Sequence, residues 1–131
     1  SEALLPNDKP ARARATQWLI AALNSIEPFA QAVASIDIFA QGEAWARLRR
    51  PGAVEFLKKR LTGLSNALGD KPYLDGAAFT AGDLMMTTVL RIKEDITGEF
   101  PNLKAYVGRC TARPAFQRAL AAQISDFRKA A

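Results

Sequence analysis

The segment Phe79-Thr80-Ala81-Gly82-Asp83-Leu84 has the pattern that begins a buried helix, and the rest of the chain is interpreted from it. Thr80 is predicted to be the N-cap, with its hydroxyl accepting from the Asp83 amide and the Asp83 carboxylate accepting from the Thr80 amide. Phe79 and Leu84 then take the two positions of a hydrophobic staple. A helix that starts inside a core needs such a cap, because its first amides have no water to bond. We therefore assign Asp83 to capping rather than to catalysis.

Two helices with strong apolar patterns lie on either side of the Asp75-Gly76 turn signal. The helix predicted from Thr80 to about Lys93 is expected to be central and buried, through Ala81, Leu84, Met85, Thr88, Val89 and Ile92. The helix predicted from Pro51, in its first turn, to Gly69 has a stripe formed by Val54, Leu57, Leu61, Leu64 and Leu68.

Three further helices are expected. Residues 11–35 have one stripe (Ala15, Leu19, Leu23, Ile26, Ala30 and Val33), with a bend just before Pro28. Short helices follow at about 102–112 and 114–125, the last with a buried stripe formed by Phe116, Ala119, Leu120 and Ile124. No segment alternates as a half-buried strand does, so the sequence predicts an all-α bundle of five helices. Pro6 and Pro10 indicate a linker over residues 1–9, leaving 10–131 as the domain.

The composition is that of one ordinary domain, with 49% hydrophobic and 24% charged residues in a chain of 131. No apolar run approaches the ~18 residues that cross a bilayer, and the first residues do not have the form of a signal peptide. We expect no membrane partner. The single cysteine, Cys110, cannot form an internal disulfide, which favours a reducing, cytoplasmic location. Its helix is apolar, so we expect a buried, inert thiol.

The net charge of +5 raises the question of nucleic acid, but the basic residues are scattered and not interleaved with stacking aromatics. We therefore expect a solvated basic surface, which can also attract an anionic small molecule. The sequence has no histidine, which removes the Ser-His and Cys-His nucleophile pairs and the usual zinc ligand sets. We expect no metal site, and no catalytic residue is assigned to this segment.

Four motifs in order resemble glutathione S-transferases of bacterial type. The run Tyr73–Asp83 is similar to the loop and capped core helix of the family's C-terminal domain. Phe100-Pro101-Asn102-Leu103, then Ala112-Arg113-Pro114-Ala115, is similar to the family's "yPnl…aRPa" ending. The segments 14–19 and 24–28 resemble its first long helix. The resemblance covers essentially the whole chain, except that the family's N-terminal thioredoxin-like domain is absent.

The resemblance implies that the catalytic group and nearly all glutathione contacts belong to that missing domain, a partner of this one. Glutathione would be the co-substrate of the parent protein, with no cofactor bound by this chain. The helical domain would supply much of a homodimer interface and the pocket for an apolar co-substrate. By that analogy the pocket wall is formed by Arg14, Gln17, Trp18 and Ala21. Three alternatives stay open: Trp18 as simple core packing, Arg14 as a solvated or partner-facing charge, and the whole chain as a non-enzymatic protein-interaction module with the same fold.

Overall fold

A computed structural model describes residues 4–130. Helices run over Lys9–Ala21 (α1), Ala22–Ile26 (η1, a π-helical turn), Glu27–Phe39 (α2), Ala44–Leu68 (α3), Ala81–Leu90 (α4), Glu94–Thr97 (α5), Pro101–Thr111 (α6) and Pro114–Ala130 (α7). Within the described residues there is no strand, only an isolated bridge between Tyr73 and Gly76. The all-α prediction is confirmed. All five predicted helices are present, and α5 is an additional single turn.

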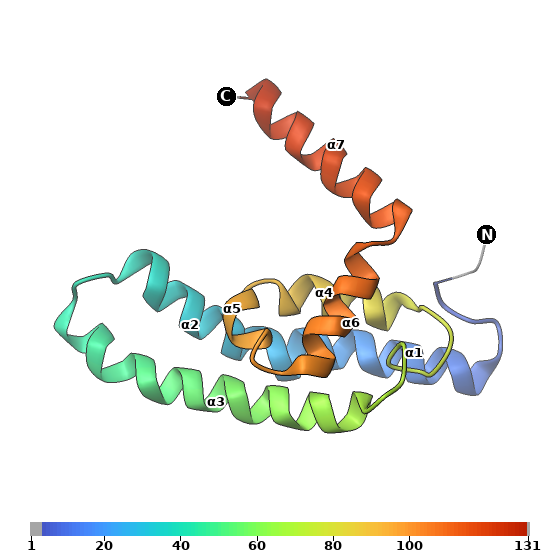
Figure 1. Ribbon diagram of the computed structural model, residues 1–131, viewed down its shortest axis with the longest axis horizontal. Helices are drawn as coiled ribbons and strands as arrows, with labels where there is room; N and C mark the ends of the chain where they lie inside the picture. Colours follow the sequence, from blue (N-terminus) through green and yellow to red (C-terminus); the bar gives the residue numbers. More distant parts are fainter. Residues whose placement is uncertain (1–3, 131) are drawn as a thin grey trace.

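Two long helical segments form the base of the fold. The continuous segment α1–η1–α2 lies beside α3, and α4 and α6 cover the hairpin that they make (Figure 1). In this arrangement α1 packs mainly on α4, whereas α2 packs mainly on α3. The leucine stripe of α3 lies at the centre of the core, where Leu57, Leu61, Leu64 and Leu68 are buried. α3 ends as predicted, because Gly69 adopts a positive φ of 55° that suits glycine.

The helix departs from regular α-geometry where a bend was predicted before Pro28, in the π-helical turn Ala22–Ile26. Proline has no amide hydrogen, and its ring crowds the carbonyl four residues earlier; a wider turn relieves both problems. The turn changes which side chains face the core, because Ala22 and Ile26 are buried whereas Leu23 is 41% exposed. The inclusion of Leu23 in the buried stripe is therefore wrong.

The predicted start of the second helix is also wrong. α3 begins at Ala44, so Pro51 lies inside the helix rather than in its first turn. Within a helix, proline leaves the carbonyl four residues earlier, here that of Arg47, without its amide partner. Arg47 is exposed, so water can take the place of that partner.

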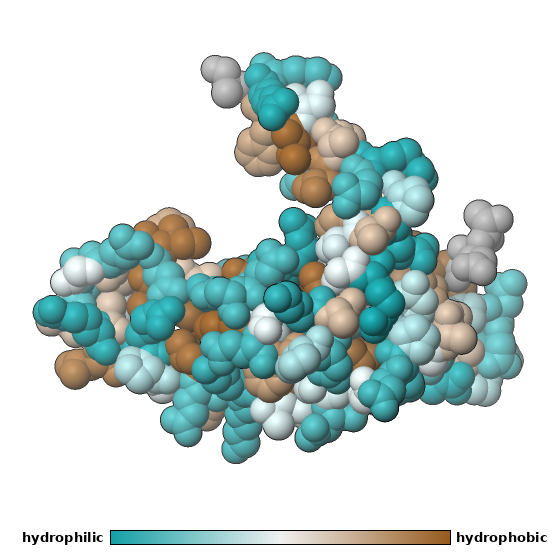
Figure 2. All heavy atoms as spheres, in the orientation of Figure 1, coloured by the Kyte–Doolittle hydropathy of each residue, from teal (hydrophilic) through white to brown (hydrophobic). Residues whose placement is uncertain are grey.

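The buried faces of two other helices differ from those predicted. α4 buries Met86, Thr87 and Leu90, whereas Leu84 is 46% exposed and Thr88 is exposed. α7 has no fully buried residue: of its predicted stripe, Phe116 and Leu120 are half-buried, and Ala119 and Ile124 are exposed. Figure 1 shows why: α7 projects from the bundle instead of folding back on it, and Figure 2 shows apolar atoms gathered along it.

The continuous helix Lys9–Phe39 contains a window of mean hydropathy 1.3, of which 33% is buried in the structure. By length and composition alone this helix meets the criterion for a membrane span, contrary to the sequence estimate. Core helices of soluble proteins meet the same criterion, and this helix packs against α3 and α4. The window therefore gives only weak evidence for a membrane segment.

Candidate functional site

The start of α4 is held by a buried network that we call the Asp83 network, formed by Leu74, Thr80, Asp83 and Tyr106. Both hydrogen bonds of a capping box are present at Thr80 and Asp83. The Thr80 amide donates to Asp83 Oδ2 at 2.9 Å, and the Thr80 hydroxyl also accepts from the Gly82 amide at 3.2 Å. The second carboxylate oxygen, Oδ1, accepts from the Leu74 amide and the Tyr106 hydroxyl, each at 2.9 Å. Asp83 is fully buried, and its two carboxylate oxygens join the 70–80 loop, α4 and α6.

This network has a structural role. Burial, with the neighbouring Asp83 carboxylate as the second cause, raises the pKa of Tyr106 far above its ordinary value, so the phenol stays a hydrogen-bond donor. Cys110 lies on the same helix and is buried as predicted. Burial raises the pKa of its thiol, which disfavours the reactive thiolate. Among the described residues no group of three or more His, Cys, Asp or Glu side chains is arranged to hold a metal ion.

The same turn of α4 sets the distance to α1. A Cβ placed on Gly82 would lie 2.6 Å from the Trp18 Cβ and 3.2 Å from the Ala15 carbonyl oxygen. The two helices can approach this closely only because residue 82 has no side chain. Trp18 is consequently fixed against α4 and packs on the core, half-buried.

Beside Trp18 lies a groove between α1, η1 and α3, with a volume of about 320 Å³, which we call the α1–α3 groove. The sequence-predicted Trp18 and Ala21 line it from one side, and Gly63 and Ala67 of α3 line it from the other. The buried side chains of Ile26, Leu64 and Met86 also line it. The structure thus brings two of the four predicted pocket residues together over an apolar floor.

The other two predicted pocket residues do not line this groove. The Arg14 Nε lies 2.7 Å from Asp75 Oδ1, an ion pair that ties α1 to the 70–80 loop. Gln17 is exposed on α1.

The sequence reasoning missed the cationic side of the groove, where Lys59 and Arg60 of α3 lie. The sequence analysis treated the basic residues, these two among them, only as a solvated surface. The signal was available in the spacing, since residues 60, 63, 64 and 67 recur on one side of a helix next to the leucine stripe. The sequence could not show that residues of α1 and η1 lie opposite that side.

The predicted staple residues line a second depression, between α4, α6 and α7, which we call the α7 pocket. Its volume is about 300 Å³, and Phe79, Leu84 and Phe116 form part of its wall. The Arg113 guanidinium lies 3.6 Å from the centre of the Phe79 ring. Leu4, in the entry segment, lines the same pocket and accepts a backbone hydrogen bond from the Ala81 amide. Leu4 therefore attaches the described part of the entry segment to the start of α4.

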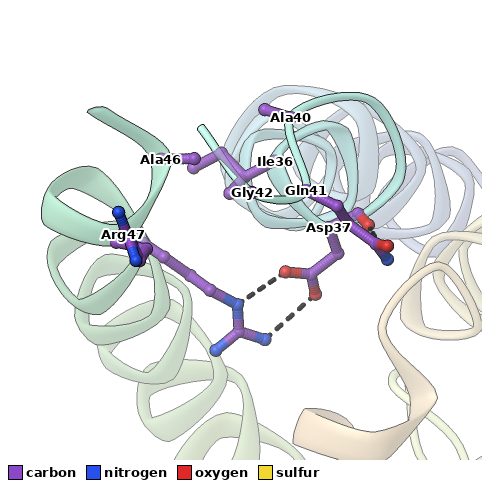
Figure 3. Close-up of a pocket in the computed structure, with 8 residues that line it drawn as sticks. Ile36, Asp37, Ala40, Gln41, Gly42, Ala46 and Arg47 are labelled. Carbon is purple, nitrogen blue, oxygen red and sulfur yellow. Dashed lines mark hydrogen bonds and ion pairs between the residues drawn. The ribbon is translucent and has the colours of Figure 1, made fainter. Parts of the chain in front are cut away.

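A third depression lies at the loop between α2 and α3 (Figure 3). There Asp37 accepts from Arg50 through both carboxylate oxygens, at 2.5 and 3.0 Å, and from Lys93 Nζ at 2.8 Å. These hydrogen bonds, that of Arg50 first, hold the pKa of Asp37 far below its usual range. The carboxylate is already matched by two cations, so these ion pairs link α2, α3 and the turn between α4 and α5.

The described residues thus form an all-helical domain with a capped central helix and an apolar groove between its long helices. No family model matches the sequence. Among curated proteins the chain is 38% identical over 68 residues to the tetrachloro-p-hydroquinone reductive dehalogenase of Sphingobium chlorophenolicum. That match spans 48% of this chain and only 27% of the dehalogenase.

Solved structures give a longer match. The chain is similar to a glutathione transferase from Burkholderia graminis, with two glutathione molecules bound per subunit (24% identity, TM-score 0.80). It is also similar to a glutathione transferase family member from Pseudomonas fluorescens with two glutathione bound (26% identity, TM-score 0.79). Each match covers 89% of this chain but only 52% and 55% of those proteins. The chain therefore resembles the C-terminal helical domain of glutathione transferases, and it spans about half the length of the structures it matches.

Proposed function

We propose that this chain is the C-terminal domain of a glutathione transferase-like enzyme and forms the wall against which an apolar co-substrate binds. The α1–α3 groove is the observation that carries this proposal, because it joins Trp18 and Ala21 over a buried apolar floor. Binding sites for small molecules are concave and mostly apolar. The activated glutathione thiol would be supplied by a second, thioredoxin-like domain, as the resemblance implies. A reducing, cytoplasmic setting fits the single buried thiol.

The test compares two proteins: the 131-residue chain, and the product of its reading frame extended upstream. We expect the extended protein to conjugate glutathione to 1-chloro-2,4-dinitrobenzene. The chain alone should be inactive and should bind glutathione no tighter than about 1 mM by calorimetry. Micromolar binding by the chain alone would place the glutathione site in the helical domain and contradict the proposal. An extended frame without a thioredoxin-like segment would favour the interaction module instead.

A matched pair of substitutions tests the groove in the extended protein. Ala21→Trp fills the groove, so the KM for the electrophile should rise while the KM for glutathione stays unchanged. Ala13→Trp adds the same bulk on an exposed part of α1 outside the groove, and both constants should stay at their original values. Equal effects of the two substitutions would show that the groove is not the co-substrate site.

We further propose that the second domain packs on the α7 pocket. α7 has an apolar stripe but no buried residue, with Ile124 43% and Phe127 73% exposed. The chain before α1 leads directly to this pocket through Leu4. A domain placed before α1 would end beside this pocket, and covering the neighbouring stripe of α7 would remove apolar area from water.

We also propose a weak homodimer formed by the first two long helices, related by a two-fold axis. Their outer surfaces carry exposed apolar side chains, among them Ile20 and Phe56, which are 56% and 55% exposed. Sedimentation should show association that strengthens in the extended protein. A strict monomer in both proteins would contradict the dimer.

A further inference from the structure

The α1–α3 groove has an asymmetric charge that its apolar floor does not explain. Its lining contains Lys59 and Arg60 and no carboxylate. Lys59 and Arg60 form no ion pair within the described residues. The adjacent Lys58, by contrast, lies 2.6 Å from Glu99. The cationic charge beside the groove is therefore unmatched.

Arg60 is also held in place. Its guanidinium carbon lies 4.7 Å from the centre of the Phe29 ring, and Phe29 packs against Phe56 with ring centroids 6.4 Å apart. Stacking on a ring leaves the in-plane N–H donors of arginine free for another acceptor. The arginine thus has a favoured orientation without a partner for its donors.

We propose that the α1–α3 groove selects small molecules that combine an apolar body with one anionic group such as a carboxylate. The apolar body lies on Ile26, Leu64 and Met86 beside the Trp18 ring, and the anion pairs with Lys59 and Arg60 at the edge. This inference rests on the proposed function, because it names the substrate class of the same groove. A neutral molecule of the same shape gains the apolar contact but leaves both cations unmatched.

The probes are 4-phenylbutyrate and its uncharged counterpart 4-phenylbutanol, which share the apolar body and differ in charge. Trp18 and Trp45 are the two tryptophans of the chain, so Trp45→Phe leaves Trp18 as a fluorescent reporter inside the groove. In this background both probes should change Trp18 emission saturably. The acid should bind about tenfold more tightly than the alcohol, since each partly exposed ion pair contributes only a few-fold. Salt should weaken binding of the acid alone.

Substitutions assign the binding to its residues. The double variant Lys59→Gln and Arg60→Gln should lower the affinity for the acid to that for the alcohol. Lys58→Gln removes a neighbouring cation that is already paired, so it should leave the affinities for both probes unchanged. Gly63→Leu should abolish binding of both probes. A Cβ at Gly63 meets no heavy atom within 4 Å, so the first atom of the new side chain causes no clash, and a urea melt checks that the variant folds. Gly108→Leu, at an equally open helical position outside the groove, is the control.

Three results overturn the inference: no saturable signal, equal affinities for acid and alcohol, or an acid affinity that is unchanged by the double glutamine variant. Each is measured on the chain alone. They are therefore separate from failure of the proposed function, which appears as a lack of conjugation by the extended protein. If the probes behave as expected and conjugation is absent, the groove is an anion-selective site in a protein of another function.

Discussion

Replacing Asp83 by alanine should destabilise the domain more than any other single change to its polar groups. The carboxylate accepts from the Leu74 amide, the Thr80 amide and the Tyr106 hydroxyl, each at 2.9 Å. All three donor residues are at most 2% exposed. The substitution removes their common acceptor and leaves all three donors buried.

The magnitude follows from these three donors. A buried donor left without a partner costs about 1–3 kcal/mol, so three give an upper range of about 3–9 kcal/mol. The truncated side chain leaves space in which a water molecule can satisfy part of that loss. We therefore expect about 4 kcal/mol, which is a large part of the 5–15 kcal/mol available to an ordinary domain. Thr80→Ala, which removes the N-cap hydroxyl, should cost about 1 kcal/mol.

Urea unfolding followed by circular dichroism measures the effect, with Asp70→Ala, at an exposed loop carboxylate, as the control expected within about 0.5 kcal/mol. The double variant of Thr80 and Asp83 should cost less than the sum of the single changes, because both residues belong to one motif. An Asp83→Ala midpoint equal to that of the original protein would refute the network as a source of stability. Tyr106→Phe removes the hydroxyl that donates to Asp83 and leaves no buried donor without an acceptor. It should therefore cost clearly less stability than Asp83→Ala.

Three other outcomes are expected. Gly82→Ala should lose about 1–3 kcal/mol in urea melts through the 2.6 Å overlap with α1, whereas Gly108→Ala, which meets nothing, should be neutral or stabilising. The pKa of Asp37 is depressed in the folded state, so its contribution is present above the unfolded pKa of about 3.9 and is lost as the pH falls through the lower folded value. Asp37→Asn should therefore unfold more easily at pH 7, and its deficit should shrink on acidification below about pH 4; a deficit independent of pH would contradict this. The double variant Ile124→Ser and Phe127→Ser should leave the melting of this chain within about 1 kcal/mol and destabilise the extended protein more, unless α7 is exposed there too.

The sequence predicted the helices well wherever a local pattern determined them. The leucine stripe of α3, the stop at Gly69 and the turn at Gly76 follow from periodicity and from backbone freedom within a few residues. Errors occurred where the answer depended on a distant segment. The exposure of Leu84 and the openness of α7 are decided by which helix lies opposite, and one chain's periodicity cannot specify that.

The candidate site was half predictable for the same reason. Trp18 and Ala21 were named from the resemblance, and the structure places both in the groove. Arg14 faces a loop instead, because Asp75 at the turn offers a partner that lies 61 residues away in the chain. Lys59 and Arg60 belong to the groove only because residues of α1 and η1 line it opposite α3.

The π-helical turn at Ala22–Ile26 corresponds to one additional residue in an otherwise regular helix. Each residue added to an α-helix advances the azimuth of everything after it by about 100°. The two halves of the first long helix can therefore turn different faces to the core: α1 packs on α4, and α2 packs on α3. A deletion of one residue between positions 22 and 26 can be absorbed by converting this turn into ordinary α-helix, with both flanking phases kept. Relatives that differ by one residue at this point can share the same packing, so an alignment should place its gap here rather than in the loops.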